Sequence, residues 1–115
     1  MEQFHQVQDQ LREPYRQLQA AIPEVSTAYG ALHDAAMAEG ALSVKVKELI
    51  ALAISITREC DGCVVAHARG AVREGATRQE LVEMIGVAIS MNGGPGTVWG
   101  PRALAAYQEF GGETA

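Results

Sequence analysis

The stretch from Leu49 to Ile56 dictates the architecture, because seven of its eight residues are apolar. Ser43 precedes it as a good N-cap, so we expect a helix from Val44 to about Thr57. A helix that is apolar nearly all round must be covered on every side. Its longest unbroken apolar run, Leu49 to Ile54, is far short of a membrane span. The sequence therefore predicts a helix in the middle of a bundle or of an oligomer.

Helical spacing of apolar residues runs through the first third of the chain, with no alternation typical of a half-buried strand. Glu2 to Ala21 is helical in composition, and Pro14 either opens a second helix or kinks a continuous one. Pro23 suits the first turn of the next helix, which we expect to end at Gly40. This region is predicted to be entirely helical.

Start and stop signals divide the second half of the chain into three more helices. A helix from about Asp61 to Glu74 is closed by Gly75, which suits a left-handed cap. Thr77 to Glu80 reads as a capping box that opens the next helix. The run from Asn92 to Gly96 breaks that helix, and the last one is expected from roughly Pro101 to Phe110. The fold class is therefore all-α: a single-domain bundle of about six helices over residues 1–115, with its core at about 22–100.

The apolar residues are mostly small. Nearly half of the chain is apolar, yet aromatic residues make up only 5% of it. Small side chains favour close helix packing but leave little bulky material to close a core. We therefore expect another subunit to complete part of the core.

Charge and the N-terminal sequence exclude several classes of protein. The net charge is −5, and no basic stripe offsets it, which argues against nucleic acid as a partner. Dispersed charges such as Arg69, Arg73 and Arg78 are interpreted as solvated. The polar start has no basic segment followed by an apolar one, so no secretory signal and no membrane partner are expected. The predicted compartment is the cytoplasm.

The only two cysteines, Cys60 and Cys63, form a C-x-x-C pair. Such a pair can cycle between dithiol and disulfide, and its sulfurs react when a neighbour lowers the thiol pKa. A helix N-terminus, His67 and Arg58 are all placed to do so. Two cysteines in a chain without an export signal indicate thiols with a chemical role.

Glu48 and His67 are predicted to meet beside this pair. Counted from a turn near residue 59, Glu48 lies eleven residues back and His67 eight residues forward. At about 1.5 Å per residue their heights then differ by about 4–5 Å, less than one helical turn. Cys63 and His67 are four residues apart and share a helix face. The spacing predicts a proton relay from carboxylate through imidazole to sulfur.

Alternatives remain at this point. The helix dipole favours Cys60 as the reactive sulfur and His67 favours Cys63, so spacing does not choose between them. The four residues could also hold zinc, but structural zinc sites usually draw on a second ligand pair, which the chain lacks. The pair could be two buried small residues, and Glu48 could serve the helix dipole alone. His5 and His33 are interpreted as surface residues.

The combined pattern of Glu48 and Cys60-x-x-Cys63-x-x-x-His67 resembles the alkylhydroperoxidase D-like core domain of the carboxymuconolactone decarboxylase superfamily. The flanking sequences resemble it as well, over roughly residues 22–100. They are Gly40-Ala41-Leu42-Ser43 leading into Lys47-Glu48-Leu49-Ile50, and Gly75-Ala76-Thr77 leading into Glu80-Leu81.

This resemblance implies an all-helical homo-oligomer, a trimer or hexamer with interlocked helices. It also implies a thiol-dependent hydroperoxide reductase that takes a hydroperoxide or disulfide substrate and a protein or small-molecule thiol reductant, without metal or cofactor. By the same resemblance Cys63 is peroxidatic, Cys60 is resolving, and His67 and Glu48 relay the proton. The best-known members carry a histidine where this chain has Gly62.

Two other functions are consistent with the same residues. In an acid–base lyase or decarboxylase, Glu48 and His67 would act and the cysteines would be incidental. The lactone decarboxylases of the superfamily lack the cysteine pair, which argues against that branch. In a non-enzymatic redox sensor, the disulfide would instead switch assembly.

Overall fold

Six helices and no strand make up the computed structural model, which describes residues 2–115. The predicted all-α class is therefore confirmed. In chain order the helices are α1 (Gln3–Ala21), α2 (Pro23–Met37), α3 (Val44–Arg58), α4 (Asp61–Arg73), α5 (Arg78–Asn92) and α6 (Gly94–Glu109).

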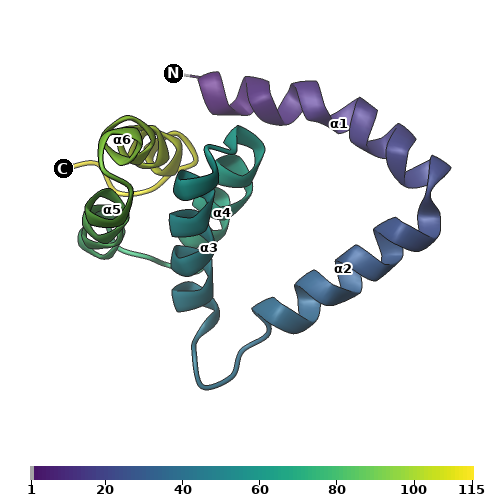
Figure 1. Cartoon of the computed structure of the whole chain (residues 1–115), viewed down its shortest axis with the longest axis horizontal. Helices are drawn as coiled ribbons and strands as arrows, with labels where there is room; N and C mark the ends of the chain where they lie inside the picture. Colours follow the sequence, from purple (N-terminus) through teal and green to yellow (C-terminus); the bar gives the residue numbers. More distant parts are fainter. Residues whose placement is uncertain (1) are drawn as a thin grey trace.

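The helices α3 and α4 form a hairpin that lies between the α5–α6 pair and the arm of α1 and α2 (Figure 1). Helices α5 and α6 pack together against one side of this hairpin, and α1 crosses α4. The N-terminal half of α1 lies close to the end of α6, where Glu109 bonds to its first turn. The hairpin is thus covered on two sides by other helices of the same chain.

Local signals explain where α3 begins and ends. Ser43 caps its first turn, its Oγ accepting a hydrogen bond from the Val46 N–H at 3.1 Å. Leu52 and Ile56 are fully buried, as the apolar pattern predicts. Ile54, however, is 56% exposed, so one face of this apolar helix remains open in the single chain.

The predicted caps around α4 and α5 are confirmed. Gly75 follows α4 with a φ of 78°, in the left-handed region that favours glycine. Thr77 and Glu80 form the capping box in both directions. The C-terminal end of α2 differs slightly from the prediction, because the helix stops at Met37 rather than at Gly40.

Pro14 does not divide the N-terminal segment, since α1 runs continuously through it. The prediction for the last helix was wrong: α6 begins at Gly94, not near Pro101. Gly93 alone, with a φ of 67°, makes the break. A Cβ at Gly96 would lie 2.9 Å from the Ile89 Cα, so the glycine-rich segment packs closely on α5 as helix. Tertiary packing here outweighs the local preference of glycine and proline for a loop.

Helices α1 and α2 form an arm that leaves the rest of the molecule (Figure 1). The arm turns back at residue 22, and α2 contacts mainly α1 and α3. The radius of gyration is 14.5 Å, whereas a compact domain of this length is expected at about 13 Å. The arm faces the hairpin (Figure 1), and a cavity lined by residues of both includes Glu48, Cys63 and His67.

Candidate active site

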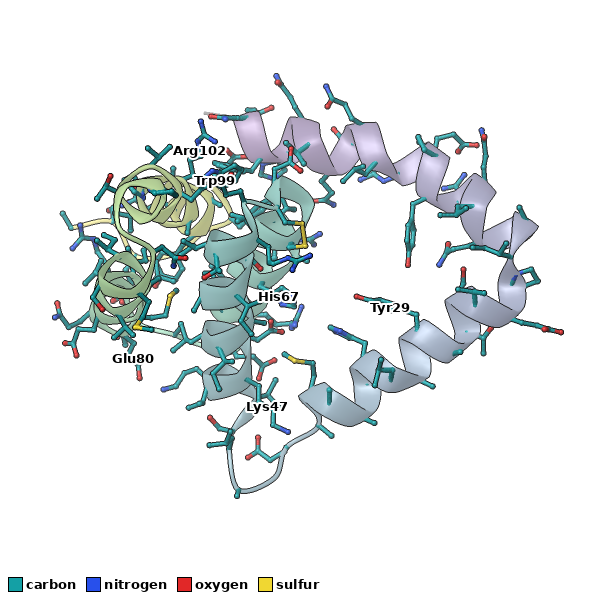
Figure 2. All side chains as sticks on the ribbon, viewed as in Figure 1. Tyr29, Lys47, His67, Glu80, Trp99 and Arg102 are labelled. Atoms are coloured by element: carbon teal, nitrogen blue, oxygen red, sulfur yellow. A yellow bond between two sulfur atoms is a disulfide. The ribbon has the colours of Figure 1, made fainter. Side chains whose placement is uncertain are left out.

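Cys60 and Cys63 lie where α4 begins, directly after the hairpin turn. Cys60 is the N-cap, and its Sγ accepts a hydrogen bond from the Cys63 N–H at 3.2 Å. The two Cα atoms are 5.2 Å apart, and the sulfurs are joined as a disulfide (Figure 2). A sulfur at a helix N-terminus faces unpaired N–H groups, which favour negative charge. The C-x-x-C pair therefore occupies the position that its predicted redox chemistry requires.

Glu48 and His67 meet across the hairpin, as their calculated heights predict. His67 Nδ1 lies 2.7 Å from Glu48 Oε1. The Glu48 side chain is only 5% exposed and that of His67 18%. A carboxylate only accepts hydrogen bonds, so the imidazole carries its proton on Nδ1. In the neutral ring this leaves Nε2 free to accept a proton.

Arg73 completes the environment of the Glu48 carboxylate. Its Nη2 donates to Glu48 Oε2 at 3.0 Å, while the arginine side chain itself is 64% exposed. Both carboxylate oxygens of Glu48 therefore have a partner, which offsets the cost of burying the charge. The interpretation of Arg73 as merely solvated was wrong. It lies six residues after His67, a spacing that does not place two residues on one helix face.

Gly70 leaves room for this carboxylate. It is buried in the middle of α4, and a Cβ there would overlap the Glu48 carboxylate. A glycine inside a helix costs about 1 kcal/mol relative to alanine, so its presence indicates a packing reason. Gly70 is also three residues after His67, on the same face. That signal was available in the sequence.

The site opens into a cavity of about 520 Å³ between the hairpin and the arm. Tyr15, Tyr29 and His33 come from the arm, and Tyr29 points from α2 toward the helix that carries His67 (Figure 2). The ring centroids of His33 and His67 are 6.1 Å apart. His33 is exposed, as predicted, yet it faces the site. The lining comprises Tyr15, Tyr29, Gly30, His33, Glu48, Gly62, Cys63, Ala66, His67 and Arg73.

Gly62 sits where α1 crosses the start of α4. A Cβ at this position would lie 3.1 Å from the Leu11 Cδ1, which is a tight contact. A side chain here would require only a small shift of the Leu11 side chain, which is 49% exposed.

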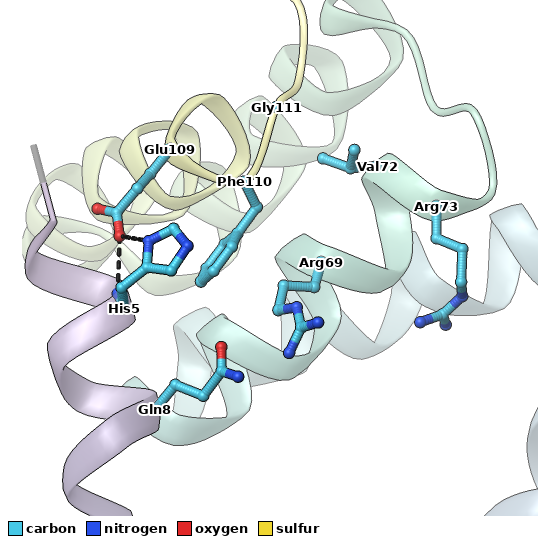
Figure 3. A pocket seen from close by; sticks show the side chains of 8 residues that line it. All are labelled: His5, Gln8, Arg69, Val72, Arg73, Glu109, Phe110 and Gly111. Carbon is cyan, nitrogen blue, oxygen red and sulfur yellow. Dashed lines mark hydrogen bonds and ion pairs between the residues drawn. The ribbon is translucent and has the colours of Figure 1, made fainter.

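A second cavity of about 670 Å³ lies between α1, α4 and α6 (Figure 3). Glu109 accepts hydrogen bonds there from the His5 N–H at 2.7 Å and from the Phe4 N–H at 3.2 Å. Burial favours a higher pKa for the Glu109 carboxyl, but these N–H donors and the His5 ring outweigh it, and the pKa is lowered. The cavity contains neither cysteine, and it shares only Arg73 with the lining of the site cavity.

No group of three or more histidine, cysteine, aspartate or glutamate side chains is close enough to share a metal ion within residues 2–115. None of the helices in this part of the chain is both long and apolar enough to cross a membrane.

Comparisons with known proteins agree with the fold and with the family resemblance. The profile of the carboxymuconolactone decarboxylase family matches residues 23–109. An uncharacterised protein of Cupriavidus necator is 40% identical over 87 residues, which span 76% of this chain and 77% of that protein. Uncharacterised protein 4 in the cox locus of Paracoccus denitrificans is 37% identical over 100 residues, spanning 81% of this chain and 90% of that protein.

A solved structure shares the same arrangement of helices. It is the crystal structure of apo-lpg0406, a carboxymuconolactone decarboxylase family protein from Legionella pneumophila, with a TM-score of 0.93 and 35% identity. The match covers 96% of this chain and 98% of that one. The resemblance seen in the motif is thus confirmed, and this chain belongs to the carboxymuconolactone decarboxylase family.

Proposed function

We propose that this protein is a thiol-dependent hydroperoxide reductase that works through Cys60 and Cys63. The observation that carries the proposal is the 2.7 Å hydrogen bond between His67 Nδ1 and Glu48 Oε1. It fixes an imidazole with a free Nε2 one helical turn after Cys63, in the same cavity. A redox pair and a proton acceptor thus share one site of suitable size.

In the reduced protein, His67 takes the proton of the Cys63 thiol. The thiolate attacks the terminal oxygen of the hydroperoxide, the O–O bond breaks, and Cys63 becomes a sulfenic acid. The leaving alkoxide accepts a proton and departs as an alcohol. The Cys60 thiol then attacks the Cys63 sulfur, forming the disulfide and releasing water.

We take Cys63 as the attacking sulfur because the family resemblance implies that role, and because Cys63, unlike Cys60, lines the cavity together with His67. Cys60, at the N-cap, is the resolving sulfur. A protein or small-molecule thiol then reduces the disulfide by exchange, which returns two protons and two electrons to the pair. We place this cycle in the cytoplasm, where thiol reductants are abundant.

The test is a stopped-flow titration of the reduced protein with an alkyl hydroperoxide, following thiol loss and disulfide formation. The wild type should form the disulfide stoichiometrically. Cys63→Ser should lose the reaction, and Cys60→Ser should consume one equivalent and stop at the sulfenic acid. Unchanged peroxide consumption by Cys63→Ser, or a wild type no faster than a free thiol, would contradict the proposal.

An acid–base lyase is the second candidate, favoured by one observation. The contact between Glu48 and His67 needs neither sulfur, and a carboxylate with an imidazole is sufficient for proton transfer at carbon. A variant with both cysteines changed to alanine separates the two functions. Activity toward a lactone acid that survives this double change would favour the lyase, whereas hydroperoxide reduction requires the sulfurs.

We further infer that a second copy of the chain covers the arm. Seven large apolar residues follow one another along α1 and α2 at intervals of three or four residues, and they are 39–66% exposed. We call them the arm stripe: Leu11, Tyr15, Leu18, Ile22, Val25, Tyr29 and Leu32. The stripe continues the buried Phe4, which already packs into the core of the same chain. Burying each such side chain contributes about 1.5–3 kcal/mol.

The same molecule also exposes a surface that suits the arm stripe. Ile50 and Ile54 on α3 are 44% and 56% exposed, and Val87 and Met91 on α5 are 64% and 80% exposed. An arm of one copy lying on α3 and α5 of another would cover both surfaces. A head-to-tail contact of this kind forms a ring when the rotation between successive copies closes, and the proposed trimer or hexamer is such a ring. Tyr15 and Tyr29 belong to both the stripe and the cavity, so the second copy would border the site.

A further inference from the structure

One group in the site cavity has no part in the relay described above. His33, on α2, lines the cavity together with Cys63 and His67. Its ring centroid is 6.1 Å from that of His67 and 6.4 Å from that of Tyr29, whose ring stacks with it. It comes from the arm, and therefore from the wall opposite the helix that carries the cysteines (Figure 1). The cavity thus holds two imidazoles on facing walls.

The displacement at the peroxide needs a proton at a place that His67 does not serve. The attacking sulfur, the attacked oxygen and the leaving oxygen lie roughly in line, so the leaving oxygen ends up on the side away from α4. His67 Nδ1 is held by Glu48, and in the proposed function its Nε2 receives the thiol proton. A donor to the leaving alkoxide must therefore lie on the opposite wall, which helix α2 provides.

We propose that His33 is this proton donor. The Cys63 thiolate forms the S–O bond, the O–O bond breaks, and the alkoxide leaves with the electron pair. It takes a proton from the His33 imidazolium, giving an alcohol and a neutral His33, which is reprotonated from water. This role rests on the proposed function and adds a second catalytic residue to it.

The other groups on the cavity wall are poorer donors. A phenol is a weaker acid than an imidazolium, which disfavours Tyr15 and Tyr29, and a guanidinium such as that of Arg73 does not release a proton in proteins. Glu48 is already bonded to His67 and Arg73. Histidine is the side chain that exchanges a proton near neutral pH. Both the acid–base chemistry of histidine and the position of His33 on the cavity wall therefore favour His33 as the proton donor.

The test compares two oxidants whose leaving groups differ in basicity. An alkyl hydroperoxide such as cumene hydroperoxide expels an alkoxide, which needs a proton, whereas peracetic acid expels acetate, which does not. The measured quantity is the rate constant for oxidation of the reduced protein by each oxidant, in wild type, His33→Gln and the neighbouring control Asp34→Asn. Both positions are exposed on α2, and circular dichroism checks that the variants fold.

His33→Gln should lower the rate constant with cumene hydroperoxide by roughly 100-fold, the lower end for loss of a general acid. With peracetic acid it should stay close to wild type, and Asp34→Asn should match wild type with both oxidants. An equal loss with both oxidants, or no loss with either, overturns the role of His33. The role of His33 is also overturned if the wild type reacts with peracetic acid but reacts with cumene hydroperoxide no faster than a free thiol does. A wild type unreactive toward both oxidants overturns the proposed function itself.

Discussion

The α3–α4 hairpin and the α1–α2 arm are built from similar sequence patterns but meet different surroundings. In the hairpin, Glu48 is buried with both carboxylate oxygens paired, and Leu52 and Val64 are fully covered. In the arm, the apolar residues recur as regularly, yet every member of the arm stripe remains exposed. Apolar spacing thus identifies the helix face that must be buried, but not whether the same chain or another chain buries it.

The hairpin and the arm contribute different groups to the site. The hairpin fixes the sulfurs and the relay through short contacts within one chain. The arm contributes Tyr15, Tyr29 and His33, which stand across the cavity and bond to none of these groups. We therefore expect changes in the hairpin to act on the chemistry directly, and most changes in the arm to act on assembly.

The largest effect is expected from Glu48→Gln, which breaks the paired interior of the hairpin and leaves the arm untouched. Glutamine has nearly the same shape as glutamate but no negative charge. The hydrogen bond from the His67 N–H is therefore weakened, and the ion pair with Arg73 is lost. The rate constant for oxidation by a hydroperoxide should fall about 100-fold or more. Stopped-flow kinetics measure it, with the exposed Glu83→Gln on α5 as control. A rate within twofold of wild type would show that Cys63 needs no relay.

The second-largest effect is expected from a double substitution in the arm, which changes no residue of the hairpin. Leu18→Glu together with Val25→Glu places two charges on the arm stripe, 53% and 61% exposed in the single chain. Burying unpaired charges in an apolar interface is costly, so the dissociation constant of the assembly should rise by roughly 100-fold or more.

Sedimentation velocity reports the outcome, and Ala20→Glu with Thr27→Glu is the control, since it adds the same charges away from the stripe. The control should keep the mass of the wild type. Identical masses for the stripe variant and the wild type would mean that the stripe has no partner of its own kind.

Local rules predicted the parts of the molecule that depend on neighbours in sequence. The Ser43 cap, the capping box at Thr77 and the left-handed Gly75 follow from single positions. The contact between Glu48 and His67 was also predicted from the sequence. In a tight helical hairpin, the number of residues between a side chain and the turn gives its height along the helix axis, so residues at similar heights face each other.

The features that sequence reasoning missed depend on contacts between distant segments. Helix α6 begins at Gly94 because Gly96 packs on α5. Arg73 reaches Glu48 through a long side chain from a position that helical spacing does not select. His33 enters the cavity only because the arm returns toward the hairpin, an angle that no local pattern specifies.

A smaller effect is expected from Gly70→Ala, which tests how tightly the hairpin is packed. The added methyl group overlaps the Glu48 carboxylate, so either the side chain or the helix must move. Overpacking of this kind costs about 1–3 kcal/mol of unfolding free energy, even though alanine favours a helix by about 1 kcal/mol. Urea unfolding measures the balance.

Gly86→Ala is the matched control for that substitution, because Gly86 is also helical and its Cβ would meet nothing within 4 Å. It should stabilise the protein slightly through helix propensity alone. If both substitutions stabilised the protein equally, the space at Gly70 would not be needed by Glu48.

The smallest effect concerns the contact between the arm and α6, where Glu109 of α6 holds the first turn of α1. Burial favours a higher pKa for this carboxyl, but the N–H groups of His5 and Phe4 and the His5 ring outweigh it and lower the pKa. The ionised form is therefore favoured by folding, and its contribution is complete above the ordinary value of 4.5. It is lost as the pH falls below 4.5 through the lowered pKa.

Glu109→Gln should thus reduce the unfolding free energy by about 1 kcal/mol at neutral pH, the usual loss for a helix cap. The difference from wild type should shrink in acid, because the wild-type carboxyl is then protonated as well. Urea unfolding at pH 7 and pH 3 measures both values, with Glu83→Gln as the exposed control. A difference that persists unchanged at pH 3 would mean that the Glu109 side chain holds the first turn of α1 by its shape and not by its charge.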